Sequence, residues 1–178
     1  MIGGTPWFNV GHRAGSYDFS HWLGGGMWTH TWSLPGETMQ PKMFALESDI
    51  QYPAQTPDVG DSSIQHAYGP YINRGPLGVD LPAINLQLGI GLPVPASKQN
   101  SSDLSAYGSE SQMSHMCIPR HGSRPSTISA NHPMDEKLPG AINMSFYDGH
   151  AEQVQLERLW SFYWHKDYVP PPKRPGLK

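Results

Sequence analysis

"AINMSFYDGHAEQV", residues 141–154, is the stretch that says most about the fold. In its first half apolar and polar side chains alternate, so that Ile142, Met144 and Phe146 share one face, as is typical of a half-buried strand. The Asp-Gly pair that follows, Asp148–Gly149, is the strongest short signal for a hairpin turn. The stretch therefore predicts two antiparallel strands joined by a two-residue type I′ turn.

The predicted turn also sets the register of the hairpin and the start of the next element. A two-residue turn places Phe146 opposite Ala151. A helical spacing of i, i+3, i+4 and i+7 then relates Leu156, Leu159, Trp160 and Tyr163. This spacing predicts a short C-terminal helix. Three consecutive prolines beyond it make residues 170–178 an extended tail.

The composition favours strands and loops over helices. Gly (19) and Pro (18) together form about a fifth of the 178 residues, which is above ordinary usage. One or the other recurs every few residues between positions 51 and 100, and this excludes persistent helices there. We expect one domain of the α+β class, mainly β. It would have a small antiparallel sheet with hairpins, long Gly/Pro-rich loops and a short C-terminal helix.

Charge and cysteine content exclude several classes of protein. The formal net charge is −3, and the 12 Lys and Arg residues are spread thinly, so no basic stripe for nucleic acid is expected. The single Cys117 rules out an intramolecular disulfide and a CxxC metal site. The sequence shows neither an apolar run of membrane-spanning length nor a signal peptide.

Polar residues gather in two C-terminal motifs, "RHG" at 120–122 and "DGH" at 148–150. If the apolar segment before His121 pairs with the first hairpin strand, His121 comes near the turn. The first hypothesis is a structural lock made by His121, Asp148 and Gly149. The alternative is a metal-dependent hydrolase that uses His121, Asp148 and His150. No GxSxG, HxH or HExxH motif supports catalysis, so the structural interpretation is favoured.

Two further groups of residues suggest ligands. Asp58 and Asp61 offer hard oxygen atoms within "PDVGDSS", which would suit calcium, with His150 as a further candidate ligand. The EF-hand pattern is absent, and a solvated turn with Asx capping is the stronger interpretation. No other cofactor is expected.

The aromatic residues of the first 45 positions could form a stacking platform for a polysaccharide. The candidates are Trp22, Trp28 and Trp32. The alternative is that these large side chains fill the core of a Gly-rich fold with few aliphatic residues, and this alternative is favoured.

The C-terminal third resembles a known family. "CIPRHGSRP" (117–125) and "LPGAINMSFYDGHAEQVQLERLWSFYWHKDYVPP" (138–171) are similar to the end of pilin-like proteins with a prepilin-type processing segment. Their C-terminal domain is named for a His, a nine-residue spacer and an Asp-Gly pair. His121 and Asp148–Gly149 match these positions. The spacer here, residues 122–147, has 26 residues, which an insertion at about 124–139 would explain.

This resemblance implies a structural function without an active site. Residues 1–178 would be a single pseudopilin-like head whose hydrophobic N-terminal helix is absent. That helix would anchor the natural protein in the inner membrane and join it to other pilin-like subunits. The head would lie in the periplasm or at the cell surface, in a type II secretion-like or type IV pilus-like assembly. An antiparallel sheet and, in some members, a calcium-tied loop are also implied.

Overall fold

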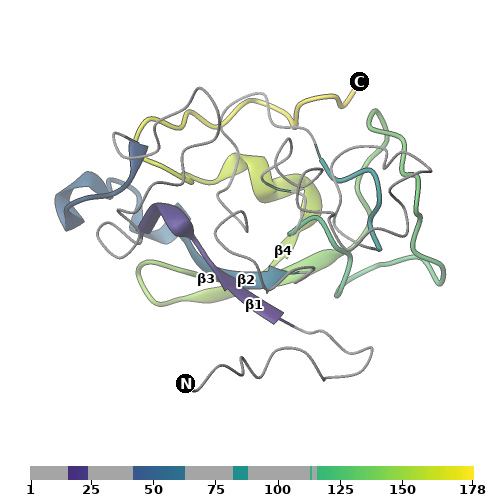
Figure 1. The fold of residues 1–178 in the computed structure, drawn as a ribbon, viewed down its shortest axis with the longest axis horizontal. Helices are drawn as coiled ribbons and strands as arrows, with labels where there is room; N and C mark the ends of the chain where they lie inside the picture. The colour runs from purple at the N-terminus through teal and green to yellow at the C-terminus, as the bar shows by residue number, and fades with distance from the viewer. Residues whose placement is uncertain (1–15, 24–41, 63–81, 88–112, 114–115) are drawn as a thin grey trace, which may run out of the picture.

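The computed structural model describes residues 16–23, 42–62, 82–87, 113 and 116–178, and its strands form one antiparallel sheet (Figure 1). The strands lie in the order β1 (Ser16–Phe19), β2 (Pro57–Ser62), β3 (Ala141–Phe146) and β4 (Ala151–Gln155). The helices of these ranges are short 3-10 helices: η2 (His21–Leu23), η4 (Glu47–Asp49), η5 (Pro53–Gln55) and η7 (Leu156–Ser161). None of them is long and apolar enough to cross a membrane. The expected mainly-β architecture with a small antiparallel sheet is confirmed.

The predicted hairpin is the pair β3–β4, and its buried face is the one that the alternation indicates. Ile142, Met144 and Phe146 are all buried in the core, as is Val154 on β4. Ile142 and Val154 lie opposite one another, so both strands present apolar side chains to the same side of the sheet.

The predicted turn and register are wrong by one residue. Ser145, and not Phe146, lies opposite Ala151. The N–H of Phe146 donates to the carbonyl of His150 at 2.9 Å, which leaves a three-residue loop. Gly149 adopts φ of 89°, as expected of the left-handed glycine that closes a three-residue loop. Glycine is needed at this one position of the loop. The predicted register is wrong by one residue because Asp-Gly belongs to a three-residue loop and is not a complete two-residue turn.

β2 was expected to be a turn, and this expectation is also wrong. Residues 57–62 pair with β1 on one side and with β3 on the other, so Gly60 lies opposite both Asp18 and Met144. A bulge between Pro57 and Val59 accommodates the proline. The pairing partners lie about 40 and 80 residues away in the sequence, and local composition does not reveal them.

The C-terminal helix is present, but it is a single 3-10 segment that ends at Ser161. Leu156, Leu159 and Trp160 are buried as the helical spacing predicts. Tyr163 lies beyond the helix, where its N–H donates to the carbonyl of Gln55 at 2.9 Å. Tertiary pairing therefore ends the helix earlier than the apolar spacing suggests. In Figure 1, η7 and the C-terminal segment run across one side of the sheet.

The tail contains no helix or strand, yet Arg174 docks it firmly. Its side chain is only 2% exposed. The guanidinium pairs with Glu157 at 3.0 Å and donates to the carbonyls of Met134 and Glu136 at 2.9 and 2.7 Å. A buried cation with all these partners is stabilising because its desolvation is offset by charge-assisted hydrogen bonds. Arg174 therefore holds the tail, η7 and the 134–138 segment together.

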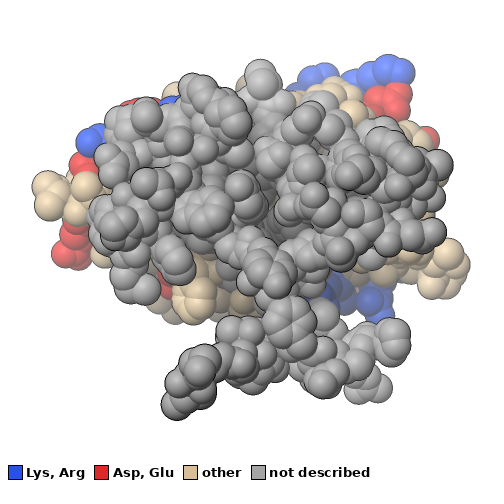
Figure 2. All heavy atoms as spheres, in the orientation of Figure 1, with Lys and Arg blue, Asp and Glu red and all other residues tan. Residues whose placement is uncertain are grey.

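Charges of both signs are interspersed over the described surface. Figure 2 shows basic and acidic side chains as neighbours at the upper margin of the molecule. Arg158 pairs with Glu152, Lys166 with Asp49 and Lys178 with Asp135. These pairs agree with the small net charge of −3 and give no single-sign field of the kind that attracts nucleic acid.

Gly140 offers a test of the junction before β3. Its φ is 78°, and an added Cβ would lie 2.6 Å from Cβ of Pro119. We expect Gly140→Ala to lower the free energy of unfolding by about 2–4 kcal/mol, because backbone strain and overlap add together. Urea unfolding followed by Trp fluorescence measures the change.

Gly149→Ala is the matched control. Gly149 has a similar φ of 89°, but an added Cβ would meet nothing within 4 Å. Only the conformational strain applies there, so the loss should be about 1 kcal/mol. Equal losses in the two variants would contradict the close packing of the chain at Gly140.

Candidate functional site

The carboxylate of Asp61 is the centre of a polar group that joins three separate segments of the chain. Asp61 lies on β2 and is only 5% exposed. Its Oδ2 accepts the backbone N–H of Asn143 on β3 at 2.7 Å and lies 3.0 Å from Nε2 of His121. The same Nε2 also lies 3.0 Å from the side-chain nitrogen of Asn143, so the tautomer of His121 decides which of the two contacts it donates to or accepts from. One side chain thus joins β2, β3 and the segment that precedes Gly122.

Arg120 places a positive charge near the same carboxylate. Its guanidinium donates to the carbonyl of Ser62 at 2.7 Å, at the end of β2. Burial lowers the pKa of Arg120, and the negative charge of Asp61 opposes this shift. The arginine stays protonated, since its pKa lies far above neutrality. Asp61 is therefore stabilised by positive charge and by hydrogen bonds, as a nearly buried carboxylate must be.

The structural lock predicted between His121 and Asp148 is wrong in its partners. His121 and Ala141 exchange both backbone hydrogen bonds at 2.8 Å, which places His121 at the start of β3. Asp148 follows the other end of β3, roughly 20 Å away by the rise of a strand. Because β2 pairs with the part of β3 nearest the turn, the segment before His121 cannot lie there. His121 does fasten a loop to the sheet, but it does so through Asp61.

Asp148 fastens its own turn. Its Oδ1 accepts the backbone N–H of His150 at 3.1 Å and contacts Nδ1 of the same residue at 2.6 Å. The imidazole also stacks on the buried ring of Phe146, with ring centroids 4.5 Å apart and planes inclined by 3°. Hydrogen bonding from His150 lowers the pKa of Asp148. "DGH" is therefore an Asx turn whose His covers the edge of the core.

The structure does not bring the proposed metal ligands together. Asp61 is engaged by His121 and Asn143, and His150 by Asp148. Asp58 lies on β2, where its carbonyl accepts the N–H of Ser20. Within the described ranges, no three His, Cys, Asp or Glu side chains are placed to share an ion. These residues do not support the calcium or hydrolase hypothesis here.

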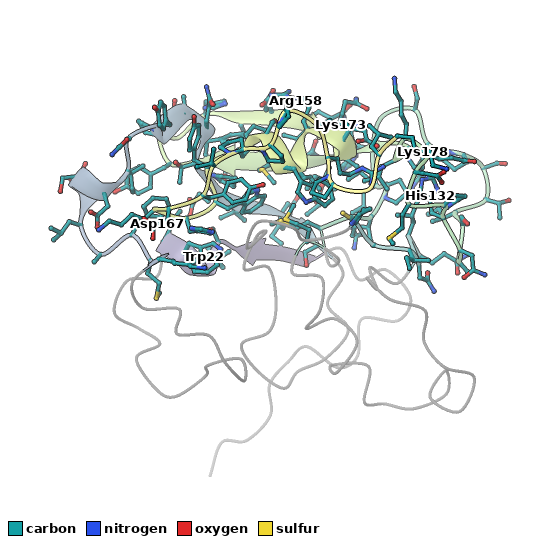
Figure 3. All side chains as sticks on the ribbon, turned by 90° about the horizontal axis from the view of Figure 1, so that it is seen from above. Trp22, His132, Arg158, Asp167, Lys173 and Lys178 are labelled. Carbon is teal, nitrogen blue, oxygen red and sulfur yellow. The ribbon has the colours of Figure 1, made fainter. Side chains whose placement is uncertain are left out.

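The predicted tryptophan platform is not formed by Trp22. This side chain is 0% exposed and contacts the ring of His165, with centroids 4.7 Å apart. Figure 3 shows Trp22 near Asp167, at the margin of the side chains that are drawn. The core interpretation is confirmed for Trp22. Trp28 and Trp32 lie outside the described residues.

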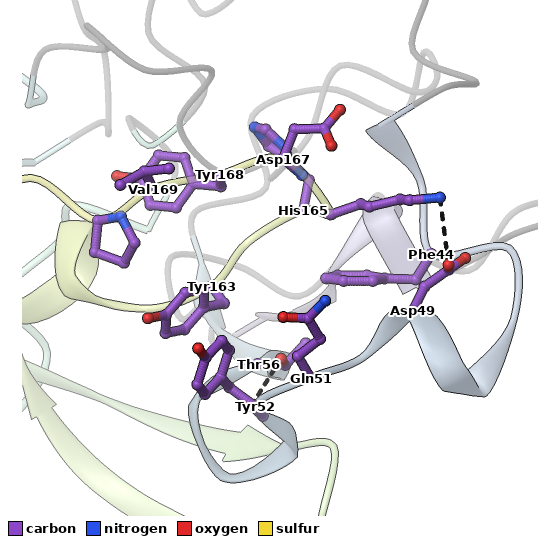
Figure 4. A pocket seen from close by; sticks show the side chains of 12 residues that line it. Phe44, Asp49, Gln51, Tyr52, Thr56, Tyr163, His165, Asp167, Tyr168 and Val169 are labelled. Carbon is purple, nitrogen blue, oxygen red and sulfur yellow. Dashed lines mark hydrogen bonds and ion pairs between the residues drawn. The ribbon is translucent and has the colours of Figure 1, made fainter.

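A pocket that the sequence did not indicate lies between two segments far apart in the chain. Residues 44–56 form one wall and residues 163–170 the other (Figure 4). Its volume is about 330 Å³. Each segment carries tyrosines beside prolines, but nothing in the local sequence shows that the two segments meet.

Comparison with protein families, curated proteins and solved structures finds no match for this chain. The pilin-like resemblance of residues 117–171 therefore remains a prediction from the motif, and the function is argued from the geometry.

Replacing Asp61 tests its central position. We expect Asp61→Ala to lower the free energy of unfolding by about 2–3 kcal/mol, because it removes the acceptor of the Asn143 N–H, the partner of His121 and a negative charge near Arg120. Asp148→Ala, at the exposed turn, should cost much less. Chemical denaturation of both variants measures the difference. A loss in Asp61→Ala no larger than that in Asp148→Ala would contradict the role given to Asp61.

The turn pair gives a pH-dependent prediction. The lowered pKa of Asp148 means that its interaction with His150 stabilises the fold above the pKa of an unfolded Asp. This stabilisation disappears as the pH falls through the lowered value. We expect His150→Ala to raise the pKa of Asp148 toward its usual range, measured by NMR titration of the side-chain carboxyl carbon. Asp135, whose pKa Lys178 lowers, is the control and should not change.

Proposed function

We propose that the chain is the head of a non-catalytic structural subunit in a type II secretion-like or type IV pilus-like assembly. The head would contact neighbouring subunits in the periplasm or at the cell surface. The N-terminal helix that the resemblance implies would anchor it. The resemblance of residues 117–171 supports the class of protein. The exposed face of the sheet supports contact with neighbouring subunits.

The observation that carries this proposal is a pair of aromatic side chains on the edge strand β1. Tyr17 and Phe19 are 66% and 67% exposed. Asp18, which lies between them, is opposite Gly60, and Gly60 is opposite Met144 on the buried face. Tyr17 and Phe19 therefore belong to the other face of the sheet. Two neighbouring exposed rings on an edge strand are unfavourable for an isolated protein, and burying them against a partner is favourable. We call Tyr17, Phe19 and Val59 the outer patch.

The polar residues of the sheet support a structural function too. Asp61 and His121 join strands and loop, and Asp148 with His150 closes a turn. Each Asp–His pair is accounted for by a contact that stabilises the fold. These contacts hold the strands and their flanking turns together, which suits a subunit that acts through its shape.

Cysteine cross-linking of the full gene product in its natural cells tests this proposal. Phe19→Cys places a thiol in the outer patch, whereas the native Cys117 is buried. After mild oxidation of the envelope fraction, a non-reducing immunoblot should show disulfide-linked dimers of the Phe19→Cys chain, because each chain then carries one accessible thiol. Neighbouring subunits would bring the patches together.

The matched control is Lys137→Cys, at an exposed site in the loop that precedes β3. It should remain monomeric under the same oxidation. The proposal would be abandoned if Phe19→Cys also stayed monomeric, or if the protein were recovered only from the cytosolic fraction.

A further inference from the structure

The pocket between residues 44–56 and 163–170, here called the tyrosine pocket, lies apart from the outer patch. Its volume of about 330 Å³ is at the small end of the range for ligand-binding sites. Hydrogen bonds join the two walls to one another and brace the first wall internally. The N–H of Tyr163 donates to the carbonyl of Gln55 at 2.9 Å, and the hydroxyl of Thr56 donates to the carbonyl of Tyr52 at 2.9 Å. The walls are therefore largely preformed.

Aromatic rings supply the apolar surface of the pocket. Tyr52 and Tyr163 stack with centroids 4.0 Å apart and planes inclined by 16°. In Figure 4 they lie along one side of the pocket, with Phe44 and Tyr168 on other sides. The hydroxyl of Tyr168 donates to the carbonyl of Trp160 at 3.0 Å, which fixes the position of its ring. Tyr52 remains 46% exposed, so it is accessible to a ligand.

Polar groups surround these rings. Asp49 accepts the backbone N–H groups of Ala45 and Leu46 at 3.1 Å and pairs with Lys166 at 3.3 Å. These donors lower the pKa of Asp49, the N–H of Leu46 most strongly. Gln51 and Asp167 are exposed and add an amide and a carboxylate to the lining. The pocket thus offers both donors and acceptors, while its lysine is already paired.

We propose that the tyrosine pocket binds one or two units of a short, neutral oligosaccharide. The carbon–hydrogen face of a pyranose ring packs on an aromatic face, and the partly exposed ring of Tyr52, whose other face stacks on Tyr163, offers one. Its hydroxyl groups both donate and accept, which matches Gln51 and the carboxylates. An anion would meet Asp49 and Asp167, so the charge of the lining disfavours phosphates and acidic sugars.

A proline-rich peptide is the alternative occupant of an aromatic pocket. Proline has no backbone N–H, so such a peptide offers few donors to polar side chains. Here the carboxylates of Asp49 and Asp167 lie among the rings and accept hydrogen bonds from donors. The geometry therefore favours the sugar.

Titration of the isotopically labelled chain, followed by NMR, tests the proposal. The probes are cellotriose, chitotriose and a proline-rich decapeptide. We expect saturable shifts from at least one of the two saccharides, with a dissociation constant in the millimolar range. The shifts should fall on residues 44–56 and 163–170, and the peptide should cause none.

Two tyrosine variants sharpen the test. Tyr52→Ala removes the exposed ring of the stack and should weaken saccharide binding about tenfold. Tyr147→Ala makes the same change at an exposed tyrosine outside the pocket lining and should leave binding unchanged. The chemical-shift pattern of each free variant shows whether it is folded.

Three results would overturn the proposal. They are the absence of shifts with both saccharides up to their solubility, shifts confined to residues outside the two walls, and saturation by the peptide alone. Equal weakening in Tyr52→Ala and Tyr147→Ala would overturn the role of the tyrosine stack. The outer patch contributes nothing to this binding, so failure here does not bear on the cross-linking experiment.

Discussion

The carboxylate of Asp61 holds three distant parts of the chain in one place. It accepts the N–H of Asn143 within the sheet and contacts the imidazole of His121 beside it. Asp61 and Asn143 are 82 residues apart in the sequence, and a charge so little exposed is tolerated only where such partners surround it. The pairing of β2 with β3 and the path of the chain through Arg120 and His121 therefore depend on each other.

The periodicity of apolar residues in the sequence predicted the buried faces of individual elements. The alternation around Ile142 and the helical spacing from Leu156 identified the buried faces of β3 and η7, because packing against a core imposes those periods. The predicted register of β3 and β4 was wrong by one residue, because an Asp-Gly pair fits both a two-residue and a three-residue loop. β2 was missed because Gly60 and its neighbours become a strand only when β1 and β3 flank them.

The polar sites, too, could be predicted only where both partners are close in the sequence. The link between Asp148 and its turn could be foreseen in part, because both partners lie within "DGH". The partner of His121 could not be foreseen, since nothing near residue 61 marks it as a neighbour of residue 121. The tyrosine pocket was missed for this reason as well: its two walls are more than 100 residues apart. Patterns of residue type predict faces and turns, whereas pairings between distant segments require the folded chain.

The separation of the strands has a consequence for how the protein is made. A ribosome produces β1 and β2 long before β3, because the partners Gly60 and Met144 are 84 positions apart. Until then one edge of β2 has no native neighbour, and it carries an acid whose partners have not yet been synthesised. Sheets built from such distant segments form slowly, and an open edge invites wrong pairing in the interval. The charge at Asp61 discourages a second chain from occupying that edge before β3 arrives.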